Sequence, residues 1–282
     1  MTDLFPPFQP GDEPRRRRFK PVPIRVLLPN LVTLLSLCAG LTAMRLAIEG
    51  DDKLDKAVYA ILIAAVLDGL DGRLARLLKG TSRFGAELDS LADFVSFGVA
   101  PAFILYTYGL KDIASFGWVV ALLFAMACAL RLARFNVMID DPNRPEWKKN
   151  FFVGIPAPAG ALAALLPVYL HLLGLARPPG FAFVEACYAL FVALMMVSQI
   201  PTYAGKTLGA RVPREWVVPM LLVLALFIFM IVVHTFIMLT VLTIVYLALI
   251  PLGVSRYRAR ERADRHLPPP APAESAAAEP SL

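Results

Sequence analysis

The amino-acid sequence predicts an all-α protein, a polytopic transmembrane helical bundle of about eight spans. Hydrophobic residues make up 58% of the 282 residues, and the mean hydropathy is +0.63. Charged residues make up only 18%, whereas soluble domains carry about 25%. Long apolar segments recur along the chain, with positive charge in every second loop between them. We therefore expect an integral membrane protein.

Eight apolar segments lie between polar ends, and each approaches the roughly 20 residues that a spanning helix needs. They cover residues 27–48, 56–77, 91–110, 116–137, 157–175, 181–200, 216–233 and 236–254. The chain is thus expected to divide into a disordered, basic N-terminus (1–24), a transmembrane core (25–210), two additional helices (211–255) and a disordered tail (256–282).

Basic residues gather in every second loop, and such clusters mark the cytoplasmic side of a membrane protein. In chain order the clusters are Arg15 to Lys20; Arg73, Arg76, Lys79 and Arg83; Arg131, Arg134, Arg144, Lys148 and Lys149; Lys206, Arg211 and Arg214; and Arg256, Arg258, Arg260 and Arg262. This alternation predicts an even number of spans with both termini in the cytoplasm. Because the clusters flank apolar spans, the net charge of +6 indicates contact with membrane lipids rather than with nucleic acid.

Four aspartates stand where the second span ends and the third begins. Asp68 and Asp71 are three residues apart, and Asp89 and Asp93 are four apart, so each pair shares one face of a helix. A helical hairpin then brings four carboxylates together. Acidic groups near a membrane core are usually functional, and their repulsion is relieved when cations lie between them. Oxygen ligands of this kind suit Mg²⁺ or Mn²⁺, which also bind substrate phosphates.

Glycines accompany the aspartates at Gly69, Gly72 and Gly85. A glycine within a helix costs about 1 kcal/mol relative to alanine, so three at one site indicate a steric need. They leave room for a bulky ligand beside the helix backbone, although close helix–helix packing is the alternative for each of them. For the aspartates, the alternative is a pathway for cations or protons across the membrane.

The segment resembles the signature of the CDP-alcohol phosphotransferases, D-x2-D-G-x2-A-R-x8-G-x3-D-x3-D, at every fixed position. The resemblance implies a six-helix catalytic core and a site for two divalent ions, Mg²⁺ or Mn²⁺. It implies that Asp68, Asp71 and Asp89 hold metal, and that Asp93 joins them and acts as the general base. The residues implied on the nucleotide side are Asp68, Gly69, Gly72, Ala75, Arg76, Ser82 and Gly85.

Shorter motifs are similar to those of the bacterial membrane-bound phosphatidylserine synthases of this superfamily. They are Leu28–Thr33, Phe97–Ala102, Arg131–Asn136, Phe152–Ala159 and Ser198–Lys206. The resemblance implies an enzyme of the bacterial inner membrane, with its active site in the cytoplasm. It implies transfer of the phosphatidyl group from CDP-diacylglycerol to the hydroxyl of L-serine, giving phosphatidylserine and CMP.

Recognition of serine calls for a cation that binds its carboxylate, and a guanidinium does so with two hydrogen bonds. The candidates for contact with the acceptor or the lipid phosphate are Arg131, Arg134, Asn30, Thr33, Arg83 and Lys206. Anchoring at lipid headgroups is the alternative for the cations, and hydrogen bonds between helices are the alternative for Asn30 and Thr33.

The acceptor alcohol stays open at this point, because the signature itself does not identify it. Glycerol 3-phosphate, inositol phosphate and choline are alternatives to serine, and a cation or proton transporter is the alternative from another class. The last two spans carry almost no polar group. They are expected either to pack against the core or to form the surface of a homodimer.

Overall fold

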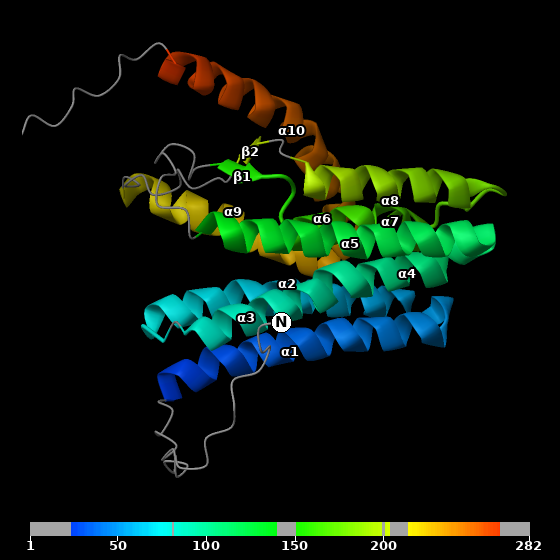
Figure 1. Cartoon of the computed structure of the whole chain (residues 1–282), viewed down its shortest axis with the longest axis horizontal. Helices are drawn as coiled ribbons and strands as arrows, with labels where there is room; N and C mark the ends of the chain where they lie inside the picture. Colours follow the sequence, from blue (N-terminus) through cyan, green and yellow to red (C-terminus); the bar gives the residue numbers. More distant parts are fainter. Residues whose placement is uncertain (1–23, 81, 140–150, 199–200, 204–213, 266–282) are drawn as a thin grey trace, which may run out of the picture.

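The structure is a computed structural model that describes residues 24–80, 82–139, 151–198, 201–203 and 214–265. Most of its helices run roughly along one long axis, and α10 slants away from it (Figure 1). Their bounds are α1 Ile24–Glu49, α2 Leu54–Leu77, α3 Arg83–Asp93, α4 Ala100–Tyr108, α5 Ala114–Ile139, α6 Ala157–Ala164, α7 Leu166–Leu172, α8 Phe181–Val197, α9 Arg214–Val233 and α10 Thr235–Arg265. Two short 3₁₀ turns, Asp51–Lys53 and Leu110–Ile113, join helices at the far end of the bundle.

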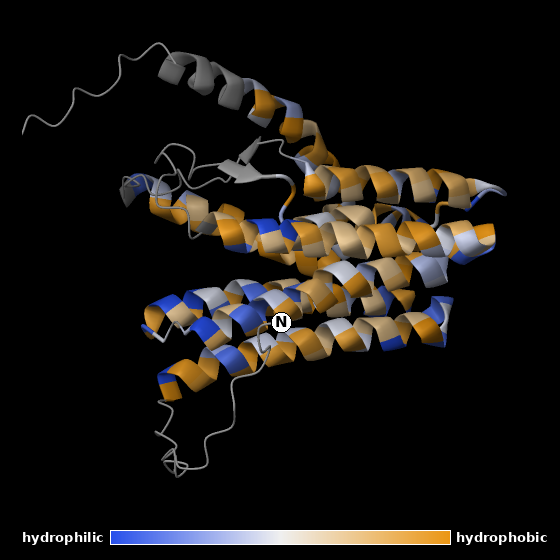
Figure 2. Cartoon of the chain, in the orientation of Figure 1, coloured by the Kyte–Doolittle hydropathy of each residue, from blue (hydrophilic) through white to orange (hydrophobic). Residues whose placement is uncertain are grey.

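Within the described part of the chain, five helices are long and apolar enough to cross a membrane. They are Ile24–Glu49, Arg83–Tyr108, Leu110–Met138, Glu215–Val233 and Thr235–Ser255, and Phe181–Val197 is a shorter apolar helix. Hydrophobic residues cover most of the length of these helices (Figure 2). The prediction of an all-α polytopic bundle, and of an integral membrane protein, is confirmed. The count of eight spans stays a prediction, because α2, the α6–α7 pair and α8 are not among these five.

The helix ends that border the predicted basic loops lie at one end of the bundle. In Figure 1 the C-terminal ends of α2, α5 and α8 and the N-terminal end of α3 point to the same side. Figure 2 shows hydrophilic residues concentrated on α2 and α3 toward that end. The aspartate segment therefore lies toward the end of the bundle at which the helices next to the predicted basic loops end or begin.

The third span forms one helical stretch that begins at Arg83, eight residues before the predicted bound at 91. Ser82 caps its start, since the Ser82 hydroxyl accepts a hydrogen bond from the Gly85 backbone N–H. Between α3 and α4, residues Phe94–Val99 form a π-helical segment directly after Asp93. Such single π turns are often found at functional sites.

Two further departures follow from elementary helix chemistry. The predicted span 157–175 is divided at Leu165, because Pro167 in the first turn of α7 has no N–H to continue the ladder of α6. Residues 256–265, predicted to belong to a disordered tail, are instead helical as part of α10. Extending an existing helix needs no new nucleus, and arginine, alanine and glutamate favour helix.

A pair of three-residue strands was not expected from the sequence. β1 (Phe151–Val153) pairs antiparallel with β2 (Pro201–Tyr203), with Phe152 opposite Thr202. The pair links the chain that leaves α5 to the chain that leaves α8. Runs of three residues are too short for an alternating pattern to be recognised.

Helix α1 packs along α2 and also contacts the π-helical segment. The Ser36 hydroxyl donates to the Ala64 carbonyl at 3.0 Å, and the Ser96 hydroxyl donates to the Ser36 carbonyl at 3.2 Å. A Cβ at Gly40 would lie 2.8 Å from the Ser96 Cα, so only glycine allows this approach of the two backbones. These contacts fix α1 relative to both arms of the aspartate hairpin.

Candidate active site

Three of the signature aspartates form one cluster between α2 and α3. Asp68 and Asp71 project from α2 and Asp89 from α3, and each offers a carboxylate oxygen within 4.8 Å of the others. Asp71 is buried, and the other two are half-buried. The three-residue spacing on α2 and the capped turn before α3 produce this convergence. The donor set consists of hard carboxylate oxygens, which fits a divalent ion such as Mg²⁺ or Mn²⁺.

Asp93 lies one turn beyond Asp89 on α3, at the border of the π-helical segment. Its carboxyl group lies close enough to that of Asp68 for the two to interact directly. The fourth aspartate therefore lies beside the cluster of three, within reach of a group held there. A side chain in this position is suited to receive a proton from a bound hydroxyl.

Two polar residues of α1, Asn30 and Thr33, face the hairpin. The Thr33 hydroxyl lies 2.7 Å from Asp71 Oδ2. A Cβ at Gly85 would lie 2.8 Å from Asn30 Oδ1, so the Asn30 side chain occupies the space that glycine leaves on α3. Asn30 and Thr33 thus touch the two arms of the hairpin, α3 and α2 respectively.

The three glycines of the signature differ in their surroundings. A Cβ at Gly69 or Gly72 would meet no heavy atom within 4 Å, so both positions border open space. Gly85 instead packs against Asn30. Close packing therefore explains Gly85, whereas Gly69 and Gly72 leave the face of α2 accessible to a ligand.

The two arginines at the end of α5 have different environments. Arg131 is half-buried and close enough to Asp93 and Asp68 to act on both electrostatically. Its guanidinium also lies over the Phe135 ring, 5.6 Å from the centroid. Arg134 Nη1 donates to the Val197 carbonyl and so ties α5 to the end of α8.

The remaining candidates lie around the hairpin turn. Ala75 is half-buried, and Arg76 and Arg83 are exposed. Ser82 serves as the N-cap of α3, and Lys206 lies outside the described residues.

One contact near the site was not predicted from the sequence. Asn136 Nδ2 donates a hydrogen bond to Ser90 Oγ at 2.9 Å and so joins α5 to α3. Its place in the Arg131–Asn136 motif was the available signal.

A cavity of about 180 Å³ lies at the opposite end of the bundle, and Asp51, Tyr108 and Lys111 are among its lining residues. None of the lining residues belongs to the aspartate segment. The carboxylate cluster, rather than this cavity, defines the candidate active site.

Comparison with known proteins accords with the geometry of the cluster. A family model described as CDP-alcohol phosphatidyltransferase matches residues 26–200. The protein belongs to the CDP-alcohol phosphatidyltransferase family. The resemblance drawn from the aspartate signature is thereby confirmed. Enzymes of this family generally use divalent metal, in agreement with the donor set of Asp68, Asp71 and Asp89.

Curated members of the CDP-alcohol phosphatidyltransferase family share much of this chain. A protein of Mycobacterium leprae is 39% identical over 250 residues, which cover 87% of this chain and 79% of the relative. A protein of Mycobacterium tuberculosis (strain H37Rv) is 41% identical over 237 residues, covering 82% and 79%. A protein of Methanocaldococcus jannaschii is 33% identical over 183 residues, covering 64% and 77%. All three are named CDP-diacylglycerol–serine O-phosphatidyltransferase.

A second model, described as CDP-alcohol phosphatidyltransferase 2, matches residues 215–251. These residues belong to α9 and α10, which lie beyond the motifs recognised in the sequence. The likeness to family members therefore extends past residue 210, the predicted end of the catalytic core.

Proposed function

We propose that this protein transfers the phosphatidyl group of CDP-diacylglycerol to the hydroxyl of L-serine, producing phosphatidylserine and CMP. The observation that carries the proposal is the 39–41% identity, over more than four fifths of the chain, to relatives named CDP-diacylglycerol–serine O-phosphatidyltransferase. The cluster of carboxylates between α2 and α3 supports the same chemistry.

The site is proposed to hold two divalent ions, Mg²⁺ or Mn²⁺, through Asp68, Asp71, Asp89 and Asp93. When bound, these ions neutralise charge on the diphosphate and on the departing CMP. The aspartates position the diphosphate beside the open face at Gly69 and Gly72, which leaves room for the nucleotide. Ala75, Arg76 and Ser82 complete the proposed nucleotide side, whereas Gly85 packs against Asn30. Arg83 and Lys206 are proposed to contact the lipid phosphate.

Asp93 is proposed to act as the general base. Its carboxylate accepts the proton of the serine hydroxyl as the serine oxygen forms a bond to the phosphorus that carries diacylglycerol. The bond from that phosphorus to the bridging oxygen breaks, and CMP leaves with the electron pair. Holding the hydroxyl in line with the leaving group supplies much of the acceleration.

Arg131 is proposed to bind the serine carboxylate. It lies near Asp93, and a guanidinium donates two parallel hydrogen bonds to a carboxylate. Arg134 is less suited to this role, because its Nη1 is already engaged by the Val197 carbonyl. The assignment explains how the acceptor hydroxyl would be brought to the general base.

The basic end of the bundle, with the aspartate cluster, is proposed to face the cytoplasm from the inner membrane of a bacterium, as are both termini. Residues 25–210 form the proposed catalytic core.

The protein is further proposed to be a homodimer. In support, α9 presents many exposed apolar side chains, among them Trp216, Leu222 and Val232. Cross-linking in native membranes tests this assembly.

The purified protein in detergent, supplied with CDP-diacylglycerol and Mn²⁺ or Mg²⁺, tests the reaction directly. L-Serine, glycerol 3-phosphate, inositol phosphate and choline are added one at a time, and both CMP and the lipid product are measured. CMP release that depends on L-serine is expected. Turnover with another alcohol and not with serine overturns the acceptor assignment, and no CMP release with any alcohol overturns the enzymatic function.

A further inference from the structure

Helix α1 contributes nothing to the aspartate signature, yet one of its side chains touches the cluster. The Thr33 hydroxyl lies 2.7 Å from Asp71 Oδ2, and both residues are only 4% exposed. The same hydroxyl lies 3.1 Å from the Pro29 carbonyl. A hydroxyl has one proton to donate. The shorter distance and the charge of a carboxylate favour donation to Asp71.

The position of Thr33 is fixed by its neighbours on α1. One turn further along, Ser36 donates to the Ala64 carbonyl on α2 and its own carbonyl accepts from Ser96. One turn earlier, Asn30 fills the space beside Gly85 on α3. The hydroxyl of Thr33 is therefore held against Asp71 by contacts to both arms of the hairpin.

We infer that Thr33 is a positioning residue for the metal ligand Asp71. Its hydrogen bond holds the carboxylate in one rotamer, with an oxygen within 4.8 Å of the carboxylate oxygens of Asp68 and Asp89. Hydrogen bonds to metal-ligating groups typically change metal affinity by about 10- to 100-fold. This role differs from the acceptor contact that the sequence predicts for Thr33, because a buried hydroxyl engaged by Asp71 is withdrawn from the substrate.

The inference rests on the proposed role of Asp71 as a metal ligand, so the test measures metal binding without substrates. Mn²⁺ is titrated into the full-length protein in detergent, and free Mn²⁺ is followed by electron paramagnetic resonance. Thr33→Val is expected to weaken Mn²⁺ binding by about 10-fold or more, whereas Thr33→Ser keeps the hydroxyl and binds within a few-fold of the unmodified protein.

Thr42 provides a matched control on the same helix. Its hydroxyl donates only to the Cys38 carbonyl, one turn back, at an exposed position. Thr42→Val therefore removes a similar hydrogen bond within α1 without touching the cluster and is expected to bind Mn²⁺ normally. Unchanged Mn²⁺ affinity in Thr33→Val, with an unchanged unfolding temperature, overturns the inference.

Asp71→Asn distinguishes failure of the positioning role of Thr33 from failure of the metal-ligand role of Asp71. If Asp71→Asn loses Mn²⁺ binding while Thr33→Val retains it, the positioning role is wrong and the metal site stands. If Asp71→Asn binds Mn²⁺ as tightly as the unmodified protein, the proposed metal role of Asp71 is itself wrong.

Discussion

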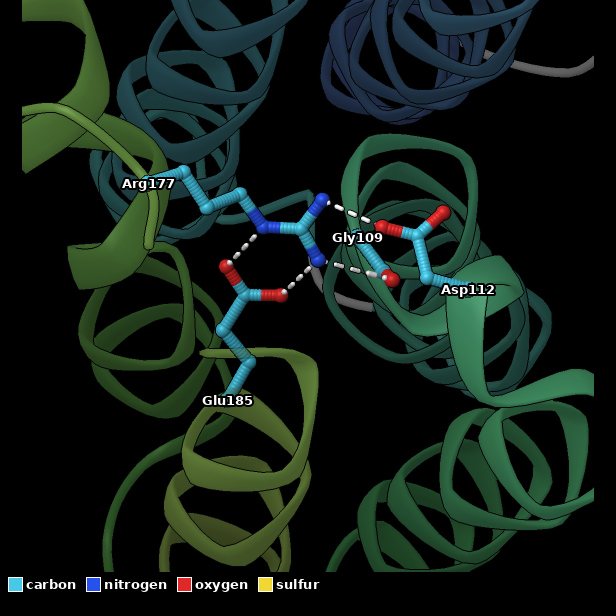
Figure 3. A network of polar contacts seen from close by, with 4 residues as sticks. All are labelled: Gly109, Asp112, Arg177 and Glu185. Carbon is cyan, nitrogen blue, oxygen red and sulfur yellow. Dashed lines mark hydrogen bonds and ion pairs between the residues drawn. The ribbon is translucent and has the colours of Figure 1, made fainter. Parts of the chain in front are cut away.

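Arg177 donates a hydrogen bond to each carboxylate oxygen of Glu185, with Nε 3.1 Å from Oε1 and Nη2 3.0 Å from Oε2 (Figure 3). The same guanidinium donates to Asp112 at 2.6 Å and to the Gly109 carbonyl at 2.9 Å. The Glu185 side chain is only 1% exposed. The loop before α8 is thereby fastened to α8 and to the turn that follows α4, at the end of the bundle opposite the aspartates.

Arg177→Met is expected to destabilise the protein strongly, because it leaves the buried Glu185 carboxylate without its partner. Loss of one member of a buried pair costs about 3–5 kcal/mol. Thermal unfolding in detergent should show a clear fall in Tm. Arg45→Met is the control: its pair with Glu49 is exposed, with 79% of the Arg45 side chain accessible, so its loss should change little. Equal Tm values for the two variants contradict the expectation.

The glycines of the signature should separate into two classes. Gly72→Ala meets open space, so the variant should fold normally while its KM for CDP-diacylglycerol rises. Gly85→Ala places a methyl group against Asn30 and should lower Tm instead. The double variant Asn30→Ala with Gly85→Ala should recover part of that loss, because the obstructing amide is removed. Normal KM in Gly72→Ala argues against a nucleotide on this face.

Asp93→Asn should lower turnover severely and weaken metal binding only in part. Loss of a general base lowers kcat by about 10²- to 10⁴-fold, whereas Asp68, Asp71 and Asp89 remain to hold Mn²⁺. Steady-state CMP release and Mn²⁺ titration measure the two effects. Glu87→Gln is the control on the same helix, since Glu87 is exposed and lies outside the cluster. Full activity in Asp93→Asn removes this residue from the role of base.

Substitution of the two arginines on α5 should give opposite results. Arg131→Met should raise the KM for serine by at least about 10-fold, the loss expected for a charge-assisted hydrogen bond. Arg131→Lys keeps the positive charge but not the two parallel hydrogen bonds, so its KM for serine should lie between those of Arg131→Met and the unmodified protein. Arg134→Met should lower Tm, because it removes the hydrogen bond between α5 and the end of α8. Its KM for serine should stay near normal. Ethanolamine, which lacks the carboxylate, reports whether Arg131 discriminates between acceptors. A raised serine KM in Arg134→Met alone reverses the assignment.

Metal removal should lower stability as well as activity. An ion that binds only the folded protein stabilises it by about 2.7 kcal/mol when present at 100 times its Kd. Chelator-treated protein should therefore unfold at a lower temperature, and Mn²⁺ or Mg²⁺ should restore both Tm and CMP release. In Asp71→Asn, Mn²⁺ should raise Tm much less than it does in the unmodified protein. A rise of equal size in that variant indicates that the ion binds elsewhere.

The arrangement of the aspartate hairpin was accessible from the sequence because it depends on local spacing. Asp68 and Asp71 share a face through the helical period alone, and the short turn before Arg83 brings Asp89 alongside them. Apolar length and the alternation of basic loops likewise predict the helical bundle. These features need no knowledge of which helices are neighbours.

Contacts between distant segments were not accessible in the same way. The bond between Thr33 and Asp71 joins residues 38 apart, and that between Arg134 and Val197 joins residues 63 apart. Each depends on how the helices rotate and shift against one another, which the helical period of a single segment does not specify. The π-helical turn after Asp93 likewise packs against α1 and α5, contacts that the sequence of the segment alone does not specify.

Helix α2 is poorly suited to enter the bilayer without a partner helix during biosynthesis. Its last three turns hold two aspartates and two arginines, and it is not among the five helices apolar enough to cross a membrane by themselves. Charges in a spanning helix oppose insertion, by about 2.5–3.5 kcal/mol each at the helix centre and by less toward its ends. Because α1 leaves the ribosome first and packs along α2, we expect the two to enter the bilayer as a paired unit, so that a loss of α1 packing would appear first as failed insertion of the catalytic helix.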